Sequence, residues 1–180
     1  SDYSAVLDAQ PDPNTAAVWE TVVEAFEDER VADLALFSNP GVGAVADFCK
    51  QGKLSKVVYA PDFITRINDE LGWGGVHGVF ARAVARRLMA VGGEPEWARS
   101  EDDIETAELI AGCALARMEL HPKVLRRSLQ VLSAHPLDRA DWLKRHARLA
   151  KGFAQCGEKP LPTVPRLERR AATCVTPKGI

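Results

Sequence analysis

Arg82 and Arg86 are the residues whose type and spacing point most directly to chemistry in this chain. They stand four positions apart within residues 75–88, a spacing that places both side chains on one face of a helix. A guanidinium group is always charged, donates hydrogen bonds and has no lone pair to give a metal ion. This face of the helix can therefore pair with carboxylates but cannot bind a metal.

Glu105 and Glu108, in the next stretch with a helical pattern, are the candidate carboxylates. Charges that become buried or half-buried need partners of opposite sign. One interpretation is therefore an ion pair between helices that joins one of these glutamates to one of the two arginines. The other is that Arg82, Arg86 and Arg87 form the solvated face of an amphipathic helix whose apolar side faces the core.

The histidines give no sign of a metal site. They are His77, His121, His135 and His146, and no two of them have the spacing of metal ligands on one element. The cysteines form no C-x-x-C pair, which argues against a cysteine zinc site. No G-x-S-x-G sequence is present to suggest a serine nucleophile. We therefore predict neither a metal ion nor another cofactor.

The four cysteines, an even number, are spread along the chain. Cys156 and Cys174 flank a proline-rich stretch, and a disulfide between them would tie the C-terminal segment to the domain. Cys113 lies within a predicted helix, where a buried free thiol is the expected state. These positions favour an oxidised, extracytoplasmic protein, either periplasmic or secreted. No signal peptide is visible, but the sequence begins at Ser1 rather than Met, which is compatible with removal of an upstream segment.

Composition and length narrow the class of protein. The 180 residues suffice for one good core but fall short of two typical domains. With 46% hydrophobic and 27% charged residues, the mixture is that of a soluble globular domain. The net charge of -2 gives no reason to expect a nucleic-acid partner. No apolar run approaches the roughly 18 residues of a transmembrane segment.

Hydrophobic periodicity and turn residues divide the chain into a helix, three strands and a series of helices. The first helix covers residues 15–29, and the strands cover 33–37, 42–48 and 56–59. The later helices cover 62–71, 73–91, 100–118, a segment that begins at His121 and Pro122, and 138–153. This order predicts an α+β fold, with a small antiparallel or mixed sheet followed by a predominantly helical half.

The domain organisation follows from the same pattern. Residues 1–156 are predicted to form a single domain, in which 1–13 are an irregular arm. From residue 157 to 180 the composition shifts, with four prolines and few large apolar residues. We expect this segment to be a C-terminal tail that either wraps the domain or stays loose.

Four segments between Asn39 and Gly157 carry a resemblance to a known family. They cover residues 39–46, 57–64, 72–88 and 104–117. In their order and spacing they resemble the small bacterial zinc metallopeptidases of the gluzincin type, relatives of the HtpX-like enzymes. The resemblance implies a zincin-like fold and a single metallopeptidase-like domain.

The departures from the family pattern fall on the active-site helix. In the H-E-x-x-H sequence of these enzymes, two histidines hold zinc and the glutamate acts as general base. Aligned with residues 81–88, the first histidine is replaced by Arg82, the glutamate by Ala83 and the second histidine by Arg86. The resemblance therefore implies that both the metal and the general base are missing.

The third zinc ligand of the family is a glutamate on the following helix, in an E-x-x-x-D sequence. The best alignment places Ile104 at this glutamate and Glu108 at the aspartate, whereas a shift of one residue would place Glu105 at the ligand. A single carboxylate cannot hold catalytic zinc, which takes three protein ligands. The implied protein is a catalytically inactive metallopeptidase, a pseudoenzyme.

A pseudoenzyme of this type is expected to bind a protein or peptide partner. The old substrate groove, between the sheet edge and the helix 73–91, would hold an extended segment by strand addition, and the arginines would favour acidic groups on it. Two alternatives remain open. The chain can be a hydrolase with relocated, non-zinc residues such as His77 with a carboxylate. It can also be a structural subunit of a larger assembly that docks through the tail 157–180.

Overall fold

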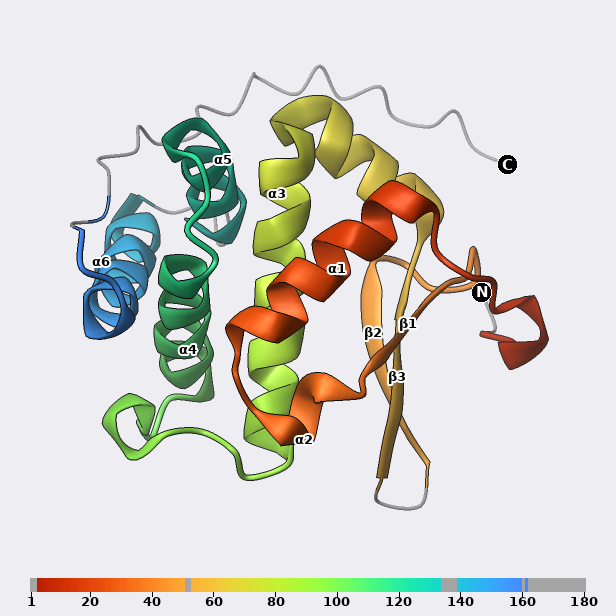
Figure 1. Cartoon of the computed structure of the whole chain (residues 1–180), viewed down its shortest axis with the longest axis horizontal. Coiled ribbons are helices and arrows are strands. Elements are labelled where there is room, and N and C mark those ends of the chain that lie inside the picture. Colours follow the sequence, from red (N-terminus) through yellow and green to blue (C-terminus); the bar gives the residue numbers. More distant parts are fainter. Residues whose placement is uncertain (1–2, 51–52, 134–138, 160, 162–180) are drawn as a thin grey trace.

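The computed structural model describes residues 3–50, 53–133, 139–159 and 161. Its elements in chain order are η1 (Ala5–Leu7), α1 (Pro13–Ala25), α2 (Glu29–Ala32), β1 (Ala35–Ser38), β2 (Val45–Lys50), β3 (Lys53–Tyr59), α3 (Pro61–Ala90), η2 (Glu96–Ala98), α4 (Asp103–Arg117), α5 (Pro122–Ser133) and α6 (Arg139–Cys156). The predicted α+β fold, with a small sheet followed by a helical half, is confirmed (Figure 1).

The sheet is mixed. Its strand order is β1-β3-β2, with β1 parallel to β3 and β2 antiparallel to β3. The arm that precedes α1 contains η1 and adds an isolated antiparallel bridge, in which Ala9 pairs with Ser38 at the outer side of β1. Asp8 anchors the same arm through Lys56 and through a 2.8 Å hydrogen bond from Asn39 Nδ2.

The helix α1 begins earlier and ends earlier than the predicted range 15–29. Asp12 caps it, because its Oδ1 accepts hydrogen bonds from the backbone N–H groups of Asn14 and Thr15 at 3.1 and 3.0 Å. At the other end, Glu27 adopts a positive φ of 50°, a conformation that cannot continue a right-handed helix. The local cap and turn residues therefore fix the bounds that hydrophobic spacing alone left open.

Gly72 divides α3 into the two helices that the sequence predicts. Its φ of 66° and ψ of -171° are not helical, and glycine adopts such a conformation without the steric cost of a Cβ atom. In Figure 1 the first part of α3 lies at an angle to the long second part. The second part carries Arg82 and Arg86.

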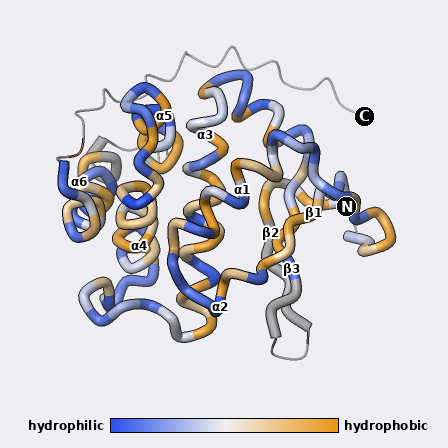
Figure 2. The backbone as a smooth tube through the Cα atoms, in the orientation of Figure 1, coloured by the Kyte–Doolittle hydropathy of each residue, from blue (hydrophilic) through white to orange (hydrophobic). Residues whose placement is uncertain are grey.

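The second part of α3 lies at the centre of the molecule. Val76, Phe80 and Val84 are fully buried, and Trp19 of α1 meets Phe80 edge to face with ring centroids 5.3 Å apart. In Figure 1, α1 crosses α3, the sheet lies to one side, and α4, α5 and α6 lie to the other. Figure 2 shows hydrophobic residues concentrated in these central elements and hydrophilic ones in the connection between α3 and α4. Within the described chain, every helix is too short or too polar to cross a bilayer.

The helices α4 and α6 approach each other closely through two glycines. A Cβ atom on Gly112 would lie 2.3 Å from the carbonyl oxygen of Leu149, and one on Gly152 would lie 2.0 Å from that of Leu109. Only a hydrogen atom fits at these positions. The close contact places Cys113 of α4 beside Cys156 at the end of α6.

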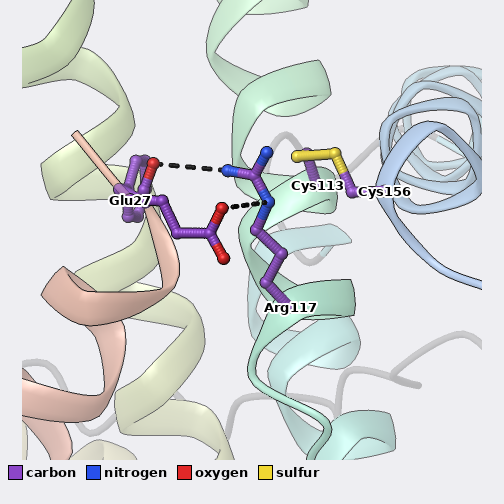
Figure 3. Close-up of a disulfide and its surroundings, with 5 residues drawn as sticks. Glu27, Cys113, Arg117 and Cys156 are labelled. Carbon is purple, nitrogen blue, oxygen red and sulfur yellow. Dashed lines mark hydrogen bonds and ion pairs between the residues drawn. A yellow bond between two sulfur atoms is a disulfide. The ribbon is translucent and has the colours of Figure 1, made fainter.

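The prediction of a Cys156–Cys174 disulfide is wrong, because Cys156 forms a disulfide with Cys113 (Figure 3). The two Cα atoms lie 5.1 Å apart, within the range that a disulfide requires. The expected free thiol at Cys113 is corrected by the same finding, and Cys174 lies outside the described residues. The bond joins two helices of the domain, and Cys156 is therefore not available to tie the tail.

Candidate functional site

A cavity of about 580 Å³ lies among α3, α4, α6 and the connection between α3 and α4. Arg82 and Arg86 line it from α3, Ile104 and Glu108 from α4, and Arg145 from α6. The cavity lies on the side of α3 that faces α4, and strand residues do not contribute to its lining within the described chain. The groove expected between the sheet edge and α3 is therefore not the cavity that these residues form.

Four of the six candidate residues meet at this cavity, and two do not. Ile104 and Glu108 are four positions apart on α4 and share one face of the helix. Glu105 lies on the adjacent face, where its Oε2 accepts a hydrogen bond from Ser100 Oγ at 3.2 Å and lies 3.6 Å from Arg148 Nη2. Ala83 is buried in the core of α3. The alignment that places Ile104 at the third ligand and Glu108 at the aspartate therefore has both of its α4 positions at the cavity, together with Arg82 and Arg86.

Glu108 is the buried carboxylate of the site. Its side chain is 3% exposed, and its two oxygens lie 3.3 Å from Arg145 Nη1 and 3.3 Å from Arg148 Nη1. Burial raises the pKa of Glu108 above its ordinary value, although the neighbouring arginines act in the opposite direction. Two cations from α6 therefore hold an anion that the protein interior disfavours.

Arg145 and Arg148 were missed in the sequence, and they change the expected pairing. Within the described chain, the ion pairs of Glu108 run to α6 and not to Arg82 or Arg86 of α3. The pattern that could have shown them is a basic pair three positions apart, which places both side chains on one face of a helix. The alternative of a solvated arginine face is also only partly right, because Arg86 is exposed but Arg87 is buried.

Arg82 is half-buried and lines the cavity from α3. Its Nη2 donates a 3.4 Å hydrogen bond to the carbonyl oxygen of Leu132, near the C-terminal end of α5. Burial lowers the pKa of Arg82, and the positive charge of Arg145 adds to this effect, but a guanidinium keeps its proton in proteins. The described residues place no carboxylate within 4.0 Å of Arg82 or Arg86.

A second cavity of about 450 Å³ shows a different balance of charge. Its arginines have acidic partners: Arg30 pairs with Asp28 at 2.7 Å, and Arg117 with Glu27 at 3.7 Å. Figure 3 shows Arg117 held by Glu27 and a backbone oxygen beside the Cys113–Cys156 disulfide. These two arginines are neutralised within the protein, whereas Arg82 and Arg86 have no ion pair in the part of the chain that the structure describes.

The side chains at the first cavity do not fit a zinc ion. The positions aligned with the two histidines carry guanidinium groups, which have no lone pair for a metal, and Glu108 is already held by two arginines. Among the described residues, His, Cys, Asp and Glu side chains form no group of three that could hold a metal. His77 lies elsewhere, buried in α3 with its Nδ1 2.7 Å from the carbonyl oxygen of Trp73, and burial lowers its pKa.

Comparisons with known proteins give this chain no relative. A scan against protein-family models and searches of curated proteins and of solved structures each found no match. The metallopeptidase resemblance therefore rests on the four sequence segments alone.

Proposed function

We propose that this chain is a catalytically inactive, metallopeptidase-like protein on a zincin-like scaffold, and that it binds a protein or peptide partner. The observation that carries the proposal is the meeting of Arg82, Arg86, Ile104 and Glu108 at one cavity. These four positions come from two helices, and the family resemblance aligns all four with the metal site. Side chains that once converged on a metal would be expected to converge on one cavity.

The chemistry of the replacements supports the absence of peptidase activity. Arginine at the two histidine positions cannot bind a metal, so the site has no Lewis acid and no activated water. Ala83, at the position of the general base, is buried and has no group to accept a proton. The residues that remain can bind and orient a ligand but cannot activate water in the manner of a zinc peptidase.

The character of the cavity supports a role in binding. Its volume of about 580 Å³ lies within the range of roughly 300–1,000 Å³ that ligand pockets span. Ile104 lines it from α4 with 53% of its surface exposed, and Arg82 and Arg86, which pair with no carboxylate among the described residues, line it from α3. An oxidised, extracytoplasmic location is part of the proposal, and the Cys113–Cys156 disulfide supports it.

Metal analysis tests the catalytic half of the proposal. Protein produced in zinc-supplemented medium and purified without chelator should carry far less than one zinc ion per chain and should leave peptide substrates uncleaved. Stoichiometric zinc, together with a peptidase activity that is lost on its removal, would contradict the pseudoenzyme.

A steric variant tests the binding half. Peptides selected from a random library on the intact protein should lose their binding to Ile104→Trp, which fills the mouth of the cavity from an exposed position. Leu143→Trp, at an exposed residue of α6 outside the cavity lining, is the matched control and should bind as the parent does. Equal binding by both variants would place the partner site elsewhere.

A further inference from the structure

The cavity among α3, α4 and α6 holds more positive charge than its own acids neutralise. Its charged lining residues are Arg82, Arg86, Arg99, Arg145, Glu94, Asp103 and Glu108. Among the residues that the structure describes, four cations against three anions leave a surplus of one positive charge. Glu94 lies 3.7 Å from Arg99, and Asp103 is in the first turn of α4, where the helix dipole favours a negative charge.

The surplus is concentrated on the α3 wall. Glu108 is occupied by Arg145 and by Arg148, which leaves Arg82 and Arg86 without an ion pair among the described residues. The hydrogen bond that Arg82 makes there is the 3.4 Å contact with Leu132, although a guanidinium offers five N–H donors. A half-buried cation without a counter-charge is costly, and the planar donors of a guanidinium match the geometry of a carboxylate.

We infer that the cavity binds a carboxylate group of a peptide, held by Arg82 and Arg86. Arginine and carboxylate match in geometry and form two parallel hydrogen bonds. A single negative charge also balances the surplus, whereas a doubly charged phosphate would stand against Glu108 and Asp103. The inference rests on the proposed function and names the chemistry that the site recognises.

The apolar part of the lining defines what should accompany the carboxylate. Met89 and Ala90 of α3 and Ile104 and Ala107 of α4 contribute nonpolar surface to the same cavity. An apolar side chain next to the carboxylate can lie against them and remove this surface from water. Two sources provide such a group: the C-terminal carboxylate of a chain that ends in an apolar residue, and an acidic side chain beside one.

Calorimetric titration of the intact protein with short peptides tests the inference. The probes are acetyl-Ala-Ala-Leu with a free carboxylate, the same peptide as its C-terminal amide, acetyl-Ala-Asp-Leu amide, and inorganic phosphate. The free acid should bind at least about tenfold more tightly than its amide, because charge-assisted hydrogen bonds are the strong ones. Arg82→Gln and Arg86→Gln should each weaken its binding by a similar factor. Arg126→Gln, at an exposed position of α5, is the matched control and should change nothing.

The titrations separate the two sources of the carboxylate and can also contradict the inference. Preference for the free acid over both amides assigns the site to a C-terminal carboxylate, and tighter binding of the aspartate peptide than of the free acid assigns it to an acidic side chain. Equal binding of these two peptides supports a carboxylate site that accepts either source. The inference is overturned if phosphate binds more tightly than the free acid, or if the neutral amide binds as tightly as the free acid. It is also overturned if both arginine variants keep the affinity of the parent, or if none of the probes binds. Those results leave the proposed function intact, because it is tested separately by the zinc content and by Ile104→Trp. Arg86 is exposed, so Arg86→Gln keeps the test valid if Arg82→Gln fails to fold.

Discussion

Glu108 pairs with two arginines although its burial disfavours the charged form of its own side chain. Its carboxylate serves Arg145 and Arg148, yet burial holds its pKa above the ordinary value near 4.5. A raised pKa in the folded state means that the folded protein binds this proton more tightly than the unfolded chain does. The contribution of Glu108 to stability is therefore fully present below pH 4.5 and declines as the pH rises through the raised value.

The direction of this pH dependence can be measured by comparing the stability of the parent protein with that of Glu108→Gln. The free energy of unfolding of the parent protein, minus that of Glu108→Gln, should decrease as the pH rises from about 4 toward neutrality. Urea unfolding at a series of pH values gives this difference. A difference that instead grows with pH would mean that the two arginines outweigh burial and lower the pKa.

Asp8 has a lowered pKa, in contrast to Glu108, and is therefore a control for the direction of the pH dependence. Burial alone would raise its pKa, but hydrogen bonds from Lys56, Asn39 and Tyr3 lower it below the ordinary value near 3.8. The stability that Asp8 provides is thus present above pH 3.8 and is lost as the pH falls through the lowered value. In the same experiment, the advantage of the parent over Asp8→Asn should shrink as the solution is acidified. An advantage that is independent of pH would contradict the anchoring of the arm by this carboxylate.

At the scale of elements, the close crossing of α4 and α6 depends on glycine. A methyl group at residue 152 would lie 2.0 Å from the Leu109 oxygen, so Gly152→Ala must force the helices apart. Overpacking of this kind costs about 3 kcal/mol at the upper end of its range, and the better helix propensity of alanine returns about 1 kcal/mol. We expect a net loss of about 2 kcal/mol in urea unfolding. Gly43→Ala is the control, because a Cβ atom there meets nothing within 4 Å, and its effect should stay within about 0.5 kcal/mol.

The disulfide fixes the same pair of helices covalently. It closes a loop with a sequence separation of 43 residues, and the chain-entropy relation gives about 4 kcal/mol for a loop of this length. Replacement of Cys113 and Cys156 by alanine should lower the free energy of unfolding by up to this amount. The addition of reductant should then have no further effect on stability.

A thiol assay provides the complementary test of the pairing. Cys49→Ser/Cys174→Ser should show no free thiol in the unfolded protein until reductant is added. Free thiols in that variant before reduction would contradict the bond between Cys113 and Cys156.

At the scale of the whole molecule, features that depend on neighbouring residues of the chain could be predicted from the sequence. Features that depend on contacts between distant segments could not. The break at Gly72 and the order of the main elements depend on neighbouring residues and were recognised, whereas both ends of α1 differ from the prediction. The Cys113–Cys156 bond and the pairing of Glu108 with α6 depend on how α6 returns along α4. That geometry is set by Gly112 and Gly152, whose small size predicts close packing only when the partner helix is known.

The same limit applies to the candidate site. The spacing of Arg82 and Arg86 on one helical face was readable, and so was the four-residue spacing of Ile104 and Glu108. One of the two interpretations placed the arginines opposite a glutamate of α4, but the wall that α6 adds to the cavity was not predicted. Periodicity shows which residues share a face but does not show which element covers that face.

Restoration of the metal ligands tests most directly whether the α3 and α4 positions derive from a metal site. The triple variant Arg82→His/Arg86→His/Ile104→Glu would supply the three protein ligands of a catalytic zinc site, and zinc content per folded chain is the quantity to measure. We predict one zinc ion per chain in this variant, none in the parent and clearly less in Arg82→His/Arg86→His with Ile104 retained. A triple variant that folds but binds no more zinc than the parent would contradict a former metal site at this cavity, and a parent that already carries one zinc ion per chain would contradict the loss of metal binding.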